Sequence, residues 1–261
     1  MKKAKKNNEK IYYYTDELED DFATMENIKL VNVDENYKFI HKNPIWNIAS
    51  FFTQNVLSMP IKYLYAKIKF NIKYIGKEKL KNAKNRGYFI YANHTQIFAD
   101  TFIPSLANYP KRNFFIVNPA NISMPGLKLL VRLLGAYPIP SNLKAYKNFL
   151  KAIKTTIERK HSITIYPEAH IWPYYTKIRN FKTVSFKYPI ELKADVFCLT
   201  NTYHKRKNGK VQIISYIDGP FKVNNNLPKK EAEQDLRDRV YSKMVERSQN
   251  SDFEKIKYIK K

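Results

Sequence analysis

The pattern of hydrophobic and polar positions divides the chain into three parts. Residues 1–42 are polar and charged, with an acidic run from Asp16 to Asp21, and we expect an arm that is at most partly ordered. Residues 43–70 form a helical segment with few charges at its start. Residues 71–261 alternate between short apolar runs and amphipathic stretches, which predicts a single α/β domain.

The segment from Asn43 to Ile61 contains 19 residues without a charge. Asn43 followed by Pro44 is typical of a helix start, because Asn caps the first turn and proline fits the first helical position. Six apolar side chains then share one helical face: Ile45, Ile48, Ala49, Phe52, Val56 and Met59. Polar residues interrupt the run, so it is a poor membrane span. A basic, aromatic stretch follows Pro60, and the whole suits either a membrane surface or the core of the domain.

Beyond residue 71 the apolar runs predict strands at 71–75, 87–92, 113–117, 162–166, 196–202 and 211–217. Amphipathic stretches predict helices at 98–107, 127–134, 142–160 and 228–249. Strands separated by helices favour a largely parallel sheet that is covered by helices. The expected fold class is therefore α/β, with an N-terminal helical segment that associates with a membrane.

The charge and the cysteine content indicate which partners and which cellular compartment to expect. The chain has 47 Lys and Arg against 23 Asp and Glu, a net charge of +24. Such an excess attracts nucleic acid or an anionic membrane surface, unless it only reflects the general abundance of lysine in this chain. The single cysteine, Cys198, excludes an intrachain disulfide and a cysteine-built zinc site. The basic N-terminus is not followed by the apolar core of a signal peptide, so we expect a reduced, cytoplasmic setting.

The first candidate for chemistry is His94, which follows a predicted buried strand and precedes Asp100 by six residues. A carboxylate bonded to one imidazole nitrogen fixes the tautomer, and the other nitrogen then takes a proton from a substrate hydroxyl. No Ser or Cys nucleophile accompanies the pair, which suits direct attack by that hydroxyl on an activated acyl group. The alternative is a histidine that caps a helix, with Asp100 at the positive end of the helix dipole.

A second strand end carries Glu168, held by Pro167. The carboxyl ends of parallel strands meet at one edge of a sheet, so we expect Glu168 and His94 to converge there. An aromatic turn, 172–175, follows, and then come Lys177 and Arg179. This arrangement predicts an apolar groove with an anion site at its mouth.

Four ordered blocks carry a resemblance to a known family: Asn93-His94 with Asp100, Gly135–Pro140, Tyr166–Glu168 and Val196–Leu199. Over roughly residues 70–220 the chain resembles the glycerolipid acyltransferases of the lysophosphatidic acid acyltransferase type. The resemblance implies transfer of a fatty acyl chain from acyl-CoA or acyl carrier protein to a hydroxyl of a lyso-lipid. It implies His94 as the general base with Asp100 as its partner, and no metal or organic cofactor. It also implies a peripheral or monotopic place on the cytoplasmic face of the cell membrane.

The expected substrate-binding residues are Asn93, Tyr166, Pro167, Glu168, His170, Lys177 and Arg179. The chain departs from the family pattern in three ways. Five residues instead of four separate His94 from Asp100, so a bulge or a non-helical start must let the pair meet. Ala169-His170-Ile171 stands where the family has Gly-Thr-Arg, and Ser141 stands where an arginine often follows the second block.

Both missing arginines are associated in the family with the phosphate of the acceptor. We expect Arg179, Lys177 or Arg132 to replace them, or an acceptor that lacks this phosphate. If the segment around Lys177 and Arg179 is extended, their spacing of two residues places both on one face and so near one phosphate.

Two other functions compete with acyl transfer. The charge and the 20 tyrosines suit a nucleic-acid-binding protein, although the chain has no recognisable binding motif. A hydrolase of lipids or thioesters would use the same His–Asp pair with water in place of the acceptor. We favour the acyltransferase, without a nucleic-acid partner.

Overall fold

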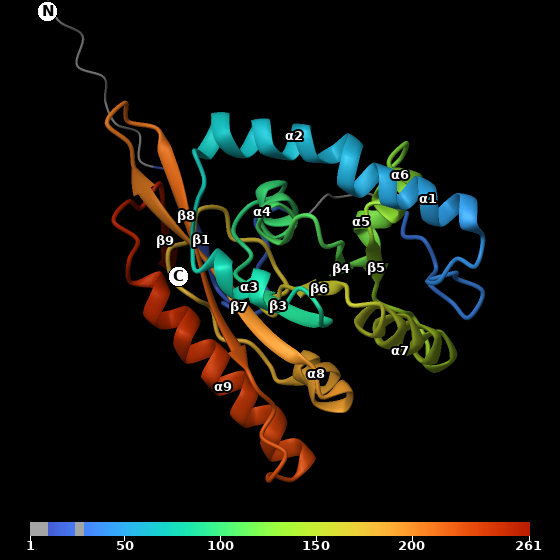
Figure 1. The fold of residues 1–261 in the computed structure, drawn as a ribbon. Helices are drawn as coiled ribbons and strands as arrows, with labels where there is room; N and C mark the ends of the chain where they lie inside the picture. Colours follow the sequence, from blue (N-terminus) through green and yellow to red (C-terminus); the bar gives the residue numbers. More distant parts are fainter. Residues whose placement is uncertain (1–9, 24–28) are drawn as a thin grey trace, which may run out of the picture.

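The computed structural model describes residues 10–23 and 29–261, and a seven-stranded sheet forms its centre (Figure 1). The strand order is β2-β8-β7-β3-β6-β4-β5. Strands β3 to β7 run parallel, whereas β8 is antiparallel to β7 and β2 runs with β8. The strands are β2 (Lys73–Ile75), β3 (Tyr88–Ala92), β4 (Asn113–Val117), β5 (Ala136–Pro138), β6 (Ser162–Ile165), β7 (Asp195–Lys205) and β8 (Val211–Phe221). The predicted α/β class with a largely parallel sheet is confirmed.

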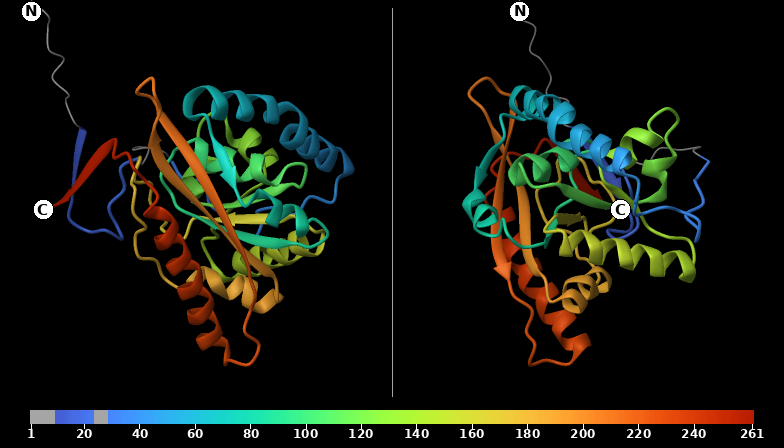
Figure 2. Two further views of the ribbon diagram at one scale, coloured as in Figure 1. Left: turned by 60° about the vertical axis from the view of Figure 1, so that its left-hand side comes forward. Right: turned by 45° about the vertical axis from the view of Figure 1, so that its right-hand side comes forward.

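Helices cover both faces of this sheet (Figures 1 and 2). Neighbouring side chains of a strand point to opposite faces of the sheet. Because helices cover both faces, β3 is buried along its whole length. Phe89 and Tyr91 belong to a core with α7 (Leu143–Glu158), α8 (Lys187–Leu192) and α9 (Lys229–Ser248). Tyr88 and Ile90 belong to the other core, with α3 (Lys77–Asn82) and α4 (Ala99–Asn108). Three short helices complete the domain: α5 (Pro119–Ser123), α6 (Lys128–Leu133) and the 3₁₀ turn η3 (Val184–Phe186).

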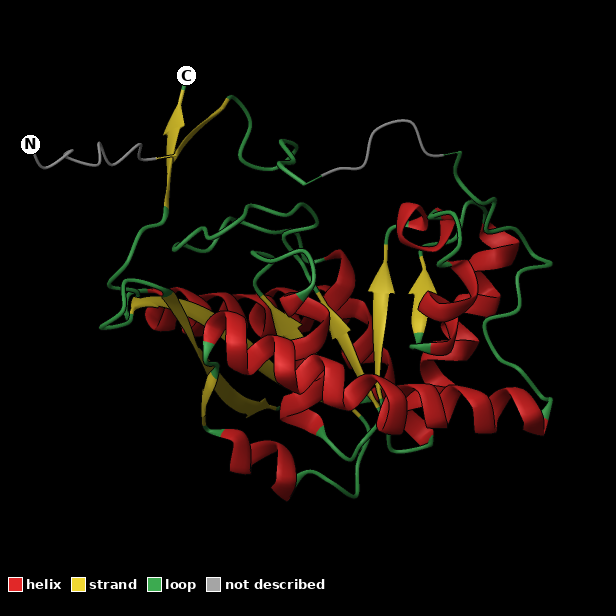
Figure 3. Ribbon diagram, turned by 90° about the horizontal axis from the view of Figure 1, so that it is seen from above, coloured by secondary structure: helices red, strands yellow, loops and turns green. Residues whose placement is uncertain are grey.

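One long helical segment crosses the α4 side of the domain (Figure 3). It consists of α1 (Pro44–Phe52), the π segment η1 (Thr53–Leu57), α2 (Ser58–Tyr65) and the π segment η2 (Ala66–Phe70). Asn43 caps it as predicted, since its side-chain oxygen accepts the N–H of Ile45 at 2.8 Å. The helix continues through Pro60, and the wide π turn before it is the kind of place where a helix accommodates an interrupted hydrogen-bond ladder.

This helical segment buries its polar side and exposes its apolar side. Ser50 and Gln54 are buried and donate to the carbonyl of Leu133 at 2.8 and 3.2 Å. The apolar side chains on the other side are between 45% and 73% exposed: Ile45, Ile48, Phe51, Phe52, Val56, Leu57, Ile61, Leu64 and Ile68. The alternative of a helix that packs its apolar face in the core is therefore wrong. No helix in the described part of the chain is both long and apolar enough to cross a membrane.

Residues 10–23 and 29–42 of the predicted N-terminal arm are ordered and contact the rest of the chain. Strand β1 (Lys10–Tyr14) pairs in parallel with β9 (Ile256–Lys260), so the two ends of the chain form a second, small sheet (Figure 3). Val33 and Phe39 are buried in the core that α7 covers. Residues 1–9 and 24–28, which belong to the same predicted arm, lie outside the described residues.

Candidate active site

His94 and Asp100 meet at the carboxyl end of β3. Residues 93–98 are not helical, and α4 begins only at Ala99, so the chain loops between the two side chains. The His94 Nδ1 atom lies 2.8 Å from Asp100 Oδ2. The predicted non-helical start and the predicted contact are both confirmed, and the loop absorbs the extra residue in the spacing.

The Asp100 carboxylate is fully buried and held by several donors. Its Oδ2 atom accepts the backbone N–H groups of Thr95 and Gln96 at 2.7 and 2.8 Å, as well as His94 Nδ1. Burial raises the pKa of Asp100, whereas the hydrogen bonds from His94 and from the two N–H groups act in the opposite direction. Since Nδ1 faces Asp100, Nε2 is the nitrogen that remains for a substrate, on a side chain that is 18% exposed.

Tyr166 fixes the orientation of the His94 ring. The two rings stack with centroids 4.3 Å apart and an angle of 22° between their planes. The Tyr166 hydroxyl donates to the backbone carbonyl of Asp100, and burial raises the pKa of this hydroxyl well above its usual value. Tyr166 therefore positions the pair by packing and by a neutral hydrogen bond.

Glu168 ties the end of β6 to the loop after β3, as the convergence of the strand ends predicts. Its Oε2 atom accepts the N–H of His94 at 2.9 Å, and its Oε1 atom accepts the N–H of Arg179 at 3.0 Å. Both side chains of the Glu168–Arg179 pair are 1% exposed, and the guanidinium Nη2 lies 3.4 Å from Oε2. Burial raises the pKa of Glu168, and the positive charge of Arg179 opposes this.

The predicted anion site at Lys177 and Arg179 is not formed. The Arg179 guanidinium turns inward, where it bonds Glu168 and the backbone carbonyls of Glu17 and His170 and lies 5.0 Å over the Trp172 ring. Lys177 is exposed. The two cations therefore do not share a face toward one phosphate, because a buried carboxylate attracts one of them into the protein.

The aromatic turn 172–175 packs against the loop that carries His94. The N–H groups of Trp172 and Tyr174 donate to the carbonyls of His94 and Thr95, each at 3.1 Å. Trp172 is fully buried in an aromatic cluster with Tyr175 of the same turn and with Tyr14, Phe22 and Tyr258 from the two ends of the chain. The turn thus holds the loop that carries His94.

The other predicted binding residues have structural contacts. Asn93 is buried and joins β3 to β7, since its side chain donates to the carbonyl of Asn201 at 3.0 Å and accepts the N–H of Asn201 at 2.8 Å. His170 Nδ1 lies 3.2 Å from Asp21 Oδ2, so an acidic residue of the N-terminal segment already faces it. Pro167 is half-buried. Ala169, which stands where the family has glycine, adopts a left-handed conformation with φ of 63°.

Sequence reasoning missed the part that the chain ends play in the site. The Trp172 indole N–H donates to the carbonyl of Asp20 at 2.7 Å, and the Tyr258 hydroxyl donates to the carbonyl of Pro173 at 2.9 Å. From β7, the Tyr203 hydroxyl donates to Thr95 Oγ1 at 2.6 Å. The only signal was the run of three tyrosines at 12–14 near the start of the chain. Within the described ranges, no group of three His, Cys, Asp or Glu side chains is arranged to hold a metal ion.

Comparisons with known proteins identify a family and a similar fold. The family model described as Acyltransferase matches residues 71–214, a stretch that includes His94, Asp100 and Glu168. A search of curated protein sequences gave no significant match. The fold is similar to the crystal structure of the 1-acyl-sn-glycerophosphate (LPA) acyltransferase PlsC from Thermotoga maritima, with a TM-score of 0.50 and 16% identity over 81% of this chain and 85% of that chain. The family model matches more than half of the residues of this chain. The chain therefore belongs to the acyltransferase family, as the resemblance of its four blocks predicts.

Proposed function

We propose that this acyltransferase moves a fatty acyl chain from acyl-CoA or acyl carrier protein to a hydroxyl of a lyso-glycerolipid, with His94 as the general base. The observation that carries the proposal is the His94–Asp100 pair at the end of β3, with Nδ1 held at 2.8 Å and Nε2 left for substrate. The similar fold of an LPA acyltransferase supports a lyso-glycerophospholipid as the acceptor, and hence a place in phospholipid synthesis.

In the proposed reaction His94 Nε2 takes the proton of the acceptor hydroxyl while its oxygen attacks the thioester carbonyl. The C–O bond forms, the C–S bond breaks, and the departing thiolate receives the proton from the imidazolium. Asp100 stabilises the imidazolium and keeps Nδ1 as the protonated nitrogen. The stacked ring of Tyr166 and the backbone bond to Glu168 hold His94 in place for both proton transfers.

Two of the three cations that the sequence predicts at the acceptor phosphate, Arg179 and Arg132, have other partners. Arg179 is buried against Glu168, and Arg132 bonds His41 at 3.3 Å at the other edge of the sheet. Ser141 bonds Asn32 and the carbonyl of Val33, both in the N-terminal segment. Lys177 is exposed and remains the candidate for this phosphate among the three expected replacements.

The direct experiment follows labelled acyl-CoA and acyl carrier protein over a panel of lyso-lipids, with and without a terminal phosphate. His94→Ala is expected to lower turnover about 10²–10⁴-fold without unfolding the protein. His204→Ala is the matched control, because His204 also faces a carboxylate, Asp252 at 2.9 Å, but lies apart from this loop. Near-normal turnover in folded His94→Ala would disprove the assignment, and release of free fatty acid in place of acylated lipid would indicate a hydrolase.

We also propose that the enzyme acts on an anionic membrane surface, at the cytoplasmic face, as a peripheral or monotopic protein. The apolar side of α1, η1, α2 and η2 supports this proposal, because so many exposed aliphatic and aromatic side chains along one helix are unfavourable in water. Lys67 and Lys69 are exposed near its end and suit anionic headgroups, whereas Lys62, in the basic stretch after Pro60, is buried, which lowers its pKa to about 8. The single buried Cys198 suits a reducing compartment.

Vesicle flotation tests the membrane proposal. Phe52 and Leu57 are 48% and 55% exposed, so burying the remainder in lipid contributes about 2 kcal/mol for the two side chains together. Phe52→Asp with Leu57→Asp should therefore weaken binding to vesicles roughly thirtyfold or more. Val184→Asp is the control, because Val184 is 61% exposed in η3, which packs with α8 and α9 on the opposite face of the sheet. Equal flotation of the double variant and the control would disprove this surface.

A further inference from the structure

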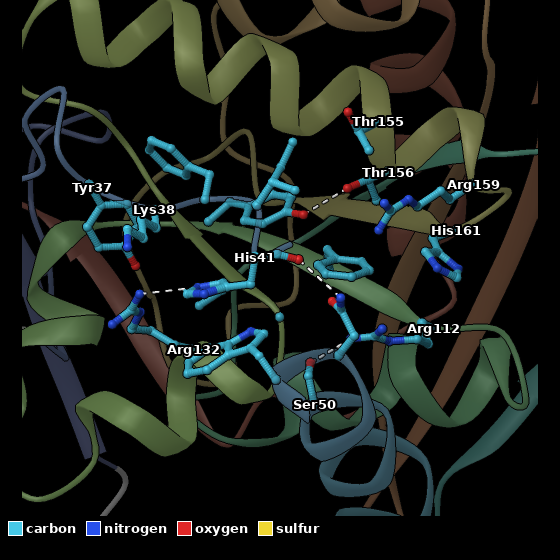
Figure 4. A pocket seen from close by; sticks show the side chains of 18 residues that line it. Tyr37, Lys38, His41, Ser50, Arg112, Arg132, Thr155, Thr156, Arg159 and His161 are labelled. Carbon is cyan, nitrogen blue, oxygen red and sulfur yellow. Dashed lines mark hydrogen bonds between the residues drawn. The ribbon is translucent and has the colours of Figure 1, made fainter. Parts of the chain in front are cut away.

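A cationic pocket lies under α1, at the opposite edge of the sheet from His94 (Figure 4). Its walls come from segment 37–41, α1, the start of β4 and β5, the last turn of α7 and the residue before β6. It is a small cavity of about 60 Å³ that opens to solvent. Because β3 to β7 are parallel, the beginnings of β4, β5 and β6 and the end of β3 lie at opposite edges. The pocket is therefore separate from the candidate active site.

The side chains of this pocket that carry a charge are all basic. Its charged and titratable side chains are Lys38, His41, Arg112, Arg132, Arg159 and His161, and none of its lining residues is acidic. Within residues 10–23 and 29–261, none of the three arginines forms an ion pair. Arg112 and Arg132 are half-buried, whereas Arg159 is exposed. A partly buried arginine is usually paired, so the two half-buried arginines without an ion pair point to an anion that is not part of the protein.

Arg112 is held in a fixed orientation toward the pocket. Its Nε donates to Gln54 Oε1 at 3.1 Å, its Nη2 donates to Ser50 Oγ at 2.5 Å, and the guanidinium lies 5.1 Å over the Phe114 ring. A guanidinium has five N–H donors, so three remain without a partner among the described residues. A half-buried guanidinium with free donors in a rigid frame is well suited to bind a phosphate through two hydrogen bonds.

Arg159 and His161 lie on the same side of the pocket as Arg112 (Figure 4). Burial, together with the charges of Arg112, Lys111 and Arg159, lowers the pKa of His161 to about 4. The charges of Arg112 and Arg159 disfavour a proton on His161, and an anion bound between the two arginines would offset this effect. On the opposite wall Arg132 lies over the rings of Tyr37 and Trp46.

We propose that this pocket binds a phosphate group through Arg112 and Arg159, as a phosphate monoester or diester. Two sources carry this chemistry, the headgroup of an anionic lipid and a soluble phosphate compound. Ser50 of α1 faces the pocket, whereas Ile48 and Phe52 are exposed on the same helix. A helix is about 10 Å thick, so an α1 that lies in the membrane interface would bring the pocket to the depth of the headgroups. The lipid source, which rests on the proposed membrane association, is the one we favour.

Binding of inorganic phosphate to the purified protein, without any acyl donor, tests the site itself. Arg159→Gln should weaken phosphate binding tenfold or more, as expected for the loss of a charge-assisted hydrogen bond. Lys151→Gln is the matched control, because Lys151 is exposed on the same helix, carries the same charge and does not line the pocket. Phosphate should also raise the pKa of His161, measured by NMR titration of the imidazole, in the control but not in Arg159→Gln.

Vesicle binding then distinguishes the two sources. If the occupant is a lipid headgroup, Arg159→Gln weakens binding to anionic vesicles more than Lys151→Gln does, and both bind neutral vesicles equally. If the occupant is soluble, the two variants bind vesicles equally and differ only with inorganic phosphate. If they differ in neither measurement, Arg159 serves only the negative end of α7 and the proposal is wrong. Since no acyl transfer is measured, failure here leaves the proposed reaction unaffected.

Discussion

The sequence predicts Arg179 at an anion site, whereas the structure buries it against Glu168. In Arg179→Met an apolar chain of similar length replaces the guanidinium that faces Glu168 at 3.4 Å in a site where both side chains are 1% exposed. Removing one partner of a buried ion pair costs about 3–5 kcal/mol. The Arg179–Glu168 contact is long, and two backbone N–H groups still bond Glu168 in the variant. We therefore expect Arg179→Met to lower the free energy of unfolding by about 3 kcal/mol, the lower end of this range. For a chain of this size that corresponds to a melting temperature lower by roughly 6–12 °C.

The assay is urea denaturation of the purified variant, together with Lys177→Met as the exposed control. Lys177→Met should change the free energy of unfolding by less than about 0.5 kcal/mol. Glu168→Gln added to Arg179→Met should recover part of the loss, because a neutral amide needs no counter-charge. The pKa of Glu168 is already raised by burial and rises further without Arg179, so the deficit should shrink as the pH falls and Glu168 becomes protonated.

The opposite result would refute this account of Arg179. If Arg179→Met is as stable as the wild type but raises the Michaelis constant for a phosphorylated acceptor tenfold, the guanidinium binds substrate phosphate and is not a buried counter-charge. A variant that is less stable, with an unchanged Michaelis constant in the folded fraction, supports the structural role.

Two further predictions concern the segments that follow and precede β3. Asp100→Asn should lower kcat by roughly 10²–10⁴-fold with little change in the Michaelis constants, because the imidazolium and its tautomer lose their partner; steady-state kinetics that show a change in binding alone would contradict this role. Gly87→Ala should destabilise the protein by about 1–3 kcal/mol or more, because a Cβ at Gly87 would lie 2.1 Å from the backbone oxygen of Ile157. An unchanged urea midpoint for that variant would show that β3 and α7 separate easily.

The local pattern of the sequence determined most of the strands and helices of the domain. The apolar run at 113–117 corresponds to β4, and the stretch at 228–249 exceeds α9 by one residue at each end. The local sequence also determined the cap at Asn43 and the loop between His94 and Asp100, because both contacts join residues that are close along the chain. Strand β5, with only three residues, was missed because so short a run carries little periodicity.

Only the tertiary structure decided which way several side chains point. Periodicity showed that 43–61 has an apolar face, but whether that face is buried depends on Leu133 and Arg112, which hydrogen-bond the polar side. The spacing of Lys177 and Arg179 allowed a shared face, but a buried carboxylate from another strand end draws the arginine inward. The pairing of β1 with β9 joins the two ends of the chain, and no local pattern records a contact at that separation. Hydrogen bonds and ion pairs between distant segments thus decided the site, because the propensities of short segments do not depend on such partners.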